Sequence, residues 1–240
     1  MARKRKVIKF KNAIEIEEFH NGRYGAPGEK RMKKGKATPE QIEKRNQYNK
    51  EKLARWKLRN NFDIHDYFTD LTYKKNQRPA SMKEAKADFK KFYTKVRSEY
   101  RKRGYELKWI RNIECGTRNA WHIHLVINRI PDTDIILSDA WGKGRVHNQL
   151  LYEKGEFAEL AAYVTKTPKT DPRLQESSYS TSKNLPVPEP KVEIMWGKKW
   201  KEPVAWKGYY IDKNSMHEGV NPITGHRYRC YTMIRINRRI

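Results

Sequence analysis

The sequence predicts an α+β fold in which helices pack on the faces of a central antiparallel sheet, and three patterns support this prediction. Apolar and polar residues alternate at positions 66–73, as they do along a half-buried strand. The stretches 106–115 and 120–129 have strand composition and are joined by a short turn, which indicates an antiparallel hairpin. From Ser81 to about residue 103, apolar side chains recur at helical spacing, and Gly104 follows as a stop signal.

The first 60 residues are expected to form a basic arm and a helix. Residues 1–36 are rich in Gly and Lys and show weak periodicity, so we expect a flexible arm with one short strand at 13–19. Thr38 can cap a helix whose first position is Pro39, because the fixed φ of proline suits that position. This helix is predicted to reach residue 59. Its few apolar residues are compatible with a solvated helix on the core or with a DNA-contacting arm.

Beyond the hairpin, turn signals separate the remaining elements. Pro131 and the glycines around Lys143 indicate a loop before the next strand, and the Ser-, Pro- and Lys-rich residues 171–190 indicate another loop. A short strand, an amphipathic helix and a strand-like run are expected at 145–151, 156–167 and 228–236. The last 50 residues are therefore interpreted as a β-rich, aromatic extension.

The composition indicates a basic globular protein whose partner is a polyanion. The 240 residues include 53 Lys and Arg against 28 Asp and Glu, which gives a formal net charge of +25, and aromatic residues make up 12%. The aromatic content argues against a wholly disordered protein, and no apolar run approaches the roughly 18 residues of a membrane span. No apolar signal segment follows the basic N-terminus, and Cys115 and Cys230 cannot form a disulfide framework. We therefore expect a cytoplasmic protein that binds nucleic acid and no membrane.

The positive charge is unevenly distributed along the chain. Residues 1–60 contain 19 Lys and Arg against 7 Asp and Glu, residues 61–185 contain 23 against 16, and the remainder contains 11 against 5. The nearly balanced middle has the charge expected of a folded catalytic core. We therefore predict three parts, namely a basic arm and helix over 1–60, a nuclease-like domain over 61–190 and a C-terminal extension over 191–240.

The most informative segment is the second strand of the hairpin, which contains His122 and His124. Alternate side chains of a strand share a face, so both imidazoles point one way while their apolar neighbours point into a core. Two such imidazoles can bind one divalent ion, and Glu114 in the preceding strand lies beside them if the hairpin register is right. An oxygen ligand favours Mg²⁺ or Mn²⁺. The same pattern also fits two half-exposed histidines with no ligand.

The predicted helix at 156–167 contains Tyr163 and Lys166 at the edge of its apolar stripe. A tyrosine hydroxyl in that position could attack phosphorus if a metal polarises the phosphate, and Lys166 could hold a phosphate oxygen or ease deprotonation of the tyrosine. The alternative is a packed amphipathic tyrosine beside a solvated lysine. Taken alone, the helix favours this alternative.

Together these segments resemble the HUH endonuclease superfamily, in particular rolling-circle replication initiator (Rep) proteins of phage, plasmid and mobile-element type. The resemblance covers residues 62–190, and three family motifs occur in the family's order. Residues 68–73 are similar to the first motif, residues 121–126 match the His-hydrophobe-His motif, and residues 163–166 match the Tyr-x-x-Lys motif. The helix has one tyrosine rather than a pair, and the chain lacks a phosphate-binding Gly-x-x-x-x-Gly-Lys loop. The resemblance therefore implies a single nucleophile and no fused helicase.

The resemblance implies an HUH-like fold of about five strands and a metal-dependent tyrosine DNA endonuclease and strand transferase. Tyr163, assisted by Lys166, would attack single-stranded DNA at an origin, possibly a hairpin, and leave a 5′-phosphotyrosine and a free 3′-OH. Helicase and polymerase would act in trans, in a bacterial host cytoplasm if the chain is phage- or plasmid-encoded. The implied ligands of Mg²⁺ or Mn²⁺ are Glu114, His122 and His124. The candidate DNA-contacting residues are Thr72, Lys74, Arg118 and Lys183.

Two other functions remain open on the sequence. A transposase or conjugative relaxase uses the same chemistry, but relaxases usually show a third histidine near the pair, and none lies close by here. A non-catalytic basic protein that coats nucleic acid would also explain the charge and the aromatic content. It would not explain why the histidine pair, the acid and the Tyr–Lys helix occur together. The other five histidines have no such partners and are expected to be structural or on the surface.

Overall fold

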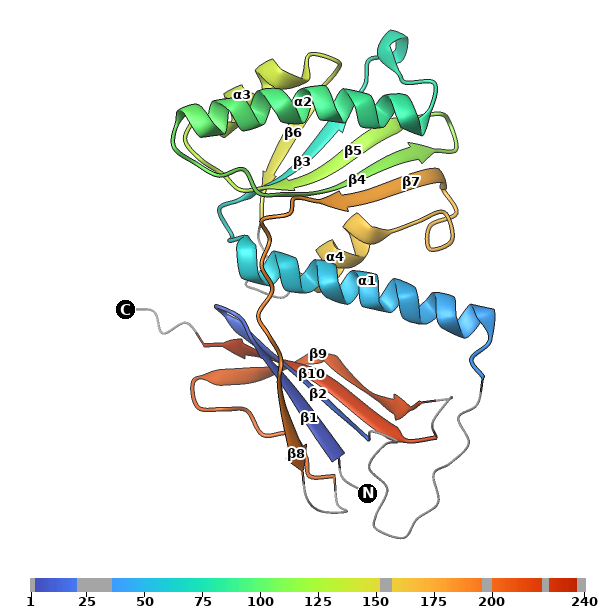
Figure 1. The fold of residues 1–240 in the computed structure, drawn as a ribbon, viewed down its shortest axis with the longest axis vertical. Coiled ribbons are helices and arrows are strands. Elements are labelled where there is room, and N and C mark those ends of the chain that lie inside the picture. Colours follow the sequence, from blue (N-terminus) through green and yellow to red (C-terminus); the bar gives the residue numbers. More distant parts are fainter. Residues whose placement is uncertain (1–2, 21–35, 152–156, 196–199, 222–224, 237–240) are drawn as a thin grey trace. The chain divides into compact units, whose positions relative to one another are not determined.

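The computed structural model contains two compact units, each with its own five-stranded antiparallel sheet (Figure 1). It describes residues 3–20, 36–151, 157–195, 200–221 and 225–236. The central unit comprises Lys50–Pro186, and the terminal unit combines Met1–Asn49 with Val187–Ile240. The predicted α+β class is therefore confirmed. The division differs from the three predicted parts, because strands from both ends of the sequence share one sheet.

Within the described ranges the chain forms helices and strands as follows. The α-helices are α1 (Pro39–Asn61), α2 (Met82–Lys102), α3 (Thr133–Trp141) and α4 (Ala158–Thr165), and a short 3-10 helix covers Lys75–Gln77. The strands of the central unit are β3 (Tyr67–Thr72), β4 (Trp109–Gly116), β5 (Trp121–Ile127), β6 (Val146–Leu150) and β7 (Leu174–Thr181). Those of the terminal unit are β1 (Arg3–Lys9), β2 (Ala13–His20), β8 (Lys191–Met195), β9 (Tyr209–Val220) and β10 (Arg227–Arg235). No helix in these ranges is long and apolar enough to cross a membrane.

Local capping signals predicted the helix starts correctly. The Thr38 hydroxyl accepts a hydrogen bond from the backbone N–H of Gln41 at 3.2 Å, and the Gln41 side chain accepts one from the Thr38 N–H at 3.0 Å. This reciprocal pair is a capping box at the start of α1. Ser81 caps α2 by accepting from the N–H of Glu84. The predicted helix at 156–167 corresponds to α4, although residues 152–156 lie outside the described residues.

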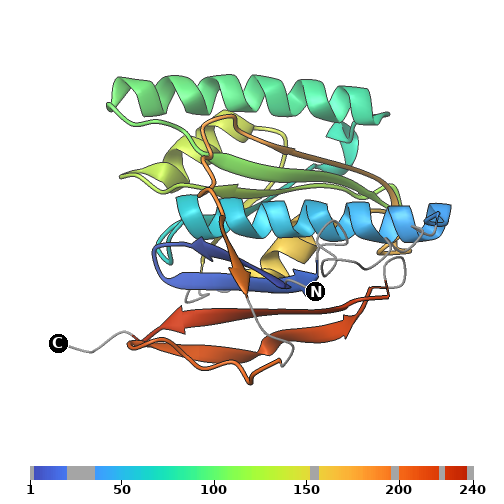
Figure 2. The same cartoon turned by 60° about the horizontal axis from the view of Figure 1, so that its bottom comes forward.

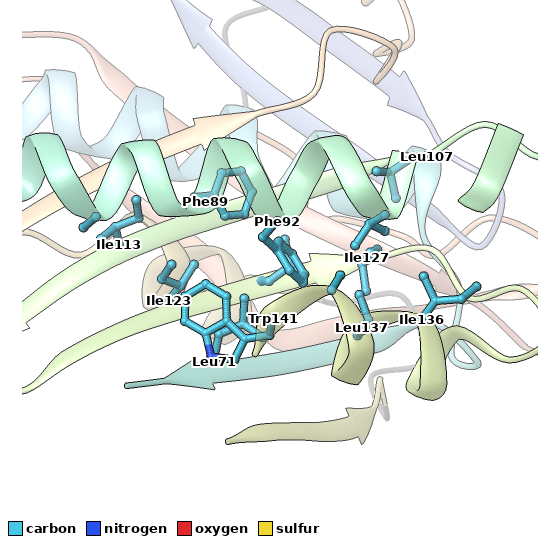
Figure 3. Packing of buried hydrophobic residues seen from close by; sticks show 14 of the residues in the cluster. Leu71, Phe89, Phe92, Leu107, Ile113, Ile123, Ile127, Ile136, Leu137 and Trp141 are labelled. Carbon is cyan, nitrogen blue, oxygen red and sulfur yellow. The ribbon is translucent and has the colours of Figure 1, made fainter. Parts of the chain in front are cut away.

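The sheet of the central unit has the order β6-β3-β5-β4-β7, so the predicted hairpin lies at its centre. Helices α2 and α3 pack on one face, as Figure 3 shows for Phe92 of α2 and Leu137 of α3 above Ile123 of β5. Each large apolar side chain buried in this way contributes about 1.5–3 kcal/mol. This packing holds the odd-numbered residues of β4 and β5 under α2 and turns the even-numbered ones to the other face.

The opposite face of this sheet is covered by α4 and by the part of α1 that belongs to the central unit. Leu58 of α1 and Val164 of α4 are fully buried in one cluster with Val126 of β5. In Figure 1, α2 and α4 lie on opposite sides of this sheet. The apolar cluster occupies only part of the face, so the adjacent polar residues of β3, β4 and β5 are left under the end of α4.

Two segments predicted as loops in the central unit are regular, and both predictions were wrong. Residues 130–144 include α3, whose Ile136, Leu137 and Trp141 bury against α2 and the sheet despite the turn signals around them. Residues 171–190 include β7, a Ser-rich strand that lacks apolar alternation. It forms because its backbone pairs with β4 from Gly116 to Ile110.

The terminal unit joins the two ends of the chain in the order β8-β1-β2-β10-β9 (Figure 2, blue and red-orange strands). The expected flexible arm is thus a hairpin over residues 3–20, while residues 21–35 lie outside the described residues. Buried Glu18 accepts hydrogen bonds from Arg5 at 2.9 Å and Arg229 at 2.8 Å. Burial alone would raise the pKa of Glu18, but these two arginines outweigh it and lower the pKa. The prediction failed because the basic N-terminus is neutralised within a sheet by residues far apart in sequence.

Gly144 provides a test of how the loop before β6 is packed against β3. A Cβ at Gly144 would lie 2.0 Å from the Thr72 carbonyl oxygen and 2.9 Å from the Tyr73 Cα, both backbone atoms. We therefore expect Gly144→Ala to destabilise the protein by about 1–3 kcal/mol, measured by chemical denaturation. The control is Gly116→Ala, where the nearest atom is at 3.6 Å. Equal stability of the two variants would contradict this close packing.

Candidate active site

The polar residues predicted from the hairpin lie together on the sheet face that α4 covers. In the β4–β5 register, Glu114 is directly opposite His122 and Asn112 is opposite His124. On the other side of β5, Asp70 of β3 is opposite His124. Because side chains alternate along a strand, all five point to the same face. The expected placement of Glu114 beside the two histidines is confirmed.

His124 is the most connected residue of this cluster. Its Nδ1 is hydrogen-bonded to Asp70, and its Nε2 lies 3.2 Å from Glu114 Oε2 and 3.2 Å from Tyr163 Oη. The residue is only 7% exposed. Burial lowers the pKa of His124, but the hydrogen bonds with Asp70 and Glu114 outweigh it, so the pKa lies above its ordinary value. In this arrangement His124 is a proton-holding link between two carboxylates and a tyrosine.

Glu114 is held by partners on both of its oxygens. Its Oε1 accepts from the Asn112 amide at 2.8 Å, and its Oε2 pairs with Lys166 Nζ at 2.9 Å. The same Asn112 amide donates to the Lys166 carbonyl at 3.3 Å, which ties the end of α4 to β4. Glu114 is only 3% exposed. A buried carboxylate needs such compensation, and here an amide and an ammonium supply it.

Tyr163 and Lys166 come from the end of α4, as the helical spacing predicted. The Tyr163 ring packs edge-on against His124 with centroids 4.9 Å apart, and Lys166 Nζ lies 4.1 Å from the ring centroid. Tyr163 remains 40% exposed, so its ring is anchored while its side remains accessible. Burial, with the charges of Glu114 and Asp70, raises the pKa of Tyr163 to about 12. The hydroxyl therefore stays protonated unless positive charge is brought to it.

His122 lies next to this cluster rather than within its hydrogen bonds. Its ring is parallel to that of His124, with centroids 6.2 Å apart, and Thr72 of β3 is opposite it in register. Burial and the neighbouring charge of His124 lower the pKa of His122. A neutral imidazole has a free nitrogen lone pair, so His122 is in the protonation state that a metal ligand requires.

The donor atoms were compared with what a divalent ion requires. In the part of the chain that the structure describes, no group of three or more His, Cys, Asp and Glu side chains has the arrangement of a metal site. The donor types nevertheless fit Mg²⁺ or Mn²⁺, and His124 Nε2 and Glu114 Oε2 are 3.2 Å apart. Two ligands at right angles on such an ion are about 3 Å apart, because each lies about 2.1 Å from it. The Asp70 contact on His124 Nδ1 is the outer support that metal-bound histidines usually have.

The residues predicted to contact DNA are spread over the central unit. Thr72 lies in the same cross-strand row as His122 and Glu114, and exposed Lys74 follows two residues later. Arg118 is exposed in the β4–β5 turn. Lys183 follows Ser182, whose N–H donates to the Trp109 carbonyl, so Lys183 lies at the opposite end of β4 from Glu114. The cluster therefore brings together Thr72 with the ligand candidates, but not Lys183.

Sequence reasoning missed three residues that shape this cluster. Asp70 supports His124, Asn112 supports Glu114, and Phe68 packs against both His124 and Tyr163 with centroids 5.9 and 5.8 Å away. A signal for them was present, since Phe68 and Asp70 share a face of β3 with Thr72, and Asn112 shares a face of β4 with Glu114. What the sequence did not show was the register that brings those faces together.

The Asp70 contact can be tested directly by NMR. In protein stripped of divalent metal, Asp70→Asn is expected to lower the pKa of His124, because it removes a negative hydrogen-bond partner of the protonated ring. The titration of the imidazole Cε1–H signals measures this change. Asp88→Asn is the matched control, since Asp88 pairs with Lys143 and contacts no histidine in the described ranges. An unchanged His124 titration in Asp70→Asn would show that the contact is absent in solution.

Comparison with known proteins adds one finding. Residues 66–168, less than half of the 240-residue chain, match the family model of replication-associated protein ORF2 and gene 2 protein. The matched segment runs from just before β3 to just after α4, so it contains the whole polar cluster. No curated protein and no solved structure matches the chain significantly. Over these residues the central unit is similar to replication-associated proteins, which is consistent with a rolling-circle replication initiator.

Proposed function

We propose that the chain nicks and rejoins single-stranded DNA at a replication origin, with Tyr163 as the nucleophile. The observation that carries this proposal is the distance of 3.2 Å between Tyr163 Oη and His124 Nε2, within a cluster that also contains Glu114 and Lys166. These residues come from α4, β4 and β5, so only the fold brings them together. The match to replication-associated proteins supports the same function.

The reaction exchanges one phosphodiester for another. The Tyr163 oxygen would attack phosphorus, the bond from phosphorus to the 3′-oxygen would break, and the 3′-oxygen would leave as a 3′-OH after taking up a proton. The product is a 5′-phosphotyrosine, and attack by a new 3′-OH would reverse the step and join a strand. No high-energy cofactor is required, because the number of phosphodiester bonds is unchanged. The free 3′-OH can prime a polymerase that acts in trans.

The residues around Tyr163 would each have a part in this reaction. Phe68 and His124 hold the ring edge-on, which fixes the direction of the hydroxyl. The Lys166 ammonium beside the ring would favour the phenolate over the phenol. The proton can pass to water, since Tyr163 is 40% exposed. A more exposed phenol with no nearby cation would be a poorer nucleophile.

Glu114, His122 and His124 are the residues that would hold Mg²⁺ or Mn²⁺. When bound, the ion would neutralise charge that develops on the oxygens of the scissile phosphate. Lys166 pairs with Glu114 at 2.9 Å in the present arrangement and therefore competes for the same carboxylate. Once released from Glu114, Lys166 is close enough to Tyr163 to hold a phosphate oxygen.

The role of Tyr163 predicts a covalent adduct. Tyr163→Phe is expected to abolish the SDS-resistant adduct with a single-stranded origin oligonucleotide while DNA binding remains, because only the attacking oxygen is removed. Tyr105→Phe is the matched control, since Tyr105 is also exposed but lies between α2 and β4. Gel mobility of a labelled oligonucleotide measures both variants. An adduct in Tyr163→Phe that matches the wild type would show that another residue is the nucleophile.

The metal assignment predicts changes of opposite sign in Mn²⁺ binding. Glu114→Gln and His122→Ala are expected to weaken binding about tenfold or more, since each removes a ligand. Lys166→Ala is expected to strengthen binding, because it removes the cation that pairs with Glu114. Electron paramagnetic resonance of free Mn²⁺ measures the affinity without any assay of DNA cleavage. His147→Ala, an exposed histidine on β6, is the control. Unchanged affinity in Glu114→Gln and His122→Ala would rule out this ligand set.

A further inference from the structure

The outward face of α2 has a row of basic side chains that the proposed reaction does not use. These residues are exposed and three, four or seven positions apart, so they lie on one side of the helix, away from its buried stripe. The row is about 27 Å long at the usual helical rise. We call it the α2 basic row, and it consists of Lys83, Lys86, Lys90, Arg97 and Arg101.

The acidic residues of α2 do not neutralise this row. Asp88 pairs with Lys143 at 2.9 Å, and Glu99 pairs with Lys102 and Arg103, both at 2.7 Å. Glu84 accepts a hydrogen bond from the N–H of Ala80 at the start of the helix. In the described ranges, none of the five cations of the row forms an ion pair. The row therefore presents a continuous positive charge that attracts a polyanion.

The chemistry of the row favours a duplex over an unpaired strand. Sites for single-stranded DNA combine cations with exposed aromatic side chains on which bases stack. None of the exposed large apolar side chains of the described residues belongs to α2, whose Phe89, Phe92 and Tyr100 are buried. Cations without stacking groups can contact phosphates, which lie on the outside of a duplex whose bases are already stacked.

The location of the row separates it from the tyrosine cluster. Helix α2 covers one face of the central sheet, while Tyr163 and His124 lie on the other face with α4 (Figure 1). A strand bound at Tyr163 therefore does not also lie along α2 without passing around the edge of the sheet. The two surfaces are suited to two different segments of DNA.

We propose that the α2 basic row binds the phosphate backbone of duplex DNA while the opposite face of the sheet acts on a single strand. The proposal rests on the proposed function only for the nature of the partner, which is DNA. It deepens that function, because it assigns the duplex beside the nicked strand to a second surface of the same unit.

The test is a triple variant, Lys86→Gln, Lys90→Gln and Arg97→Gln, in the full chain. Its matched control is Lys191→Gln, Lys207→Gln and Lys213→Gln, which removes the same charge from exposed residues of the terminal unit. Affinity for a short blunt-ended duplex and for an oligothymidine of equal length is measured over a salt titration. We expect the α2 variant to lose about tenfold in duplex affinity, with a salt slope smaller by about 3. Its oligothymidine affinity should stay unchanged, and the control should bind both as wild type does.

Three results would overturn the proposal. Unchanged duplex affinity in the α2 variant would show that the row is only solvated. Equal losses for duplex and oligothymidine would assign the row to a single strand, and equal losses in the control would show that only the total charge counts. Adduct formation on a single-stranded oligonucleotide, measured in the α2 variant, reports on the Tyr163 reaction separately. Retained duplex binding by Tyr163→Phe keeps a failure of the proposed function distinguishable from a failure of this inference.

Discussion

The pairing of β4 with β5 is the constraint on which the rest of the central unit depends. Side chains alternate between the faces of a sheet, so a slip of one residue would exchange Glu114 with an apolar neighbour. The register is held from the other face, where Ile113 and Ile123 are fully buried under α2. The hydrophobic core on one side of the sheet thus determines which polar groups meet on the other side. Packing far from Tyr163 is therefore a requirement for its surroundings.

The polar face that this register creates is a cluster of buried charge. Asp70 and Glu114 bring two carboxylates to His124, and Lys166 compensates one of them. Removing charged groups from water is costly, and the cost is offset only by close hydrogen bonds of the kind present here. The same carboxylates raise the pKa of Tyr163. The cluster is consequently poised for additional positive charge, which agrees with chemistry on a phosphate held near a cation.

The terminal unit shows a second use of long-range pairing. Strands β1 and β2 come from the first 20 residues and pair with β8 and β10 from the last 50. The positive charge at the N-terminus is therefore partly structural, as with Arg5, which binds Glu18. The positive charge on α2 has no such acid partners in the described ranges. Charge counted along the sequence identified a polyanion-binding protein, but the structure separates the cations that build the fold from those available to a partner.

The sequence by itself determined the features that depend on neighbouring residues. Periodicity and capping located α2, and alternation placed His122 and His124 on one face, because these patterns act within a few residues. Helix α3, strand β7, the terminal sheet and the contacts of Asp70 and Asn112 were decided only by the tertiary structure. Each depends on a partner distant in the chain: α2 buries Trp141, β4 pairs with β7, and β3 brings Asp70 to His124. Local patterns specify which face a side chain occupies, whereas the burial of both faces of the sheet specifies what that side chain meets.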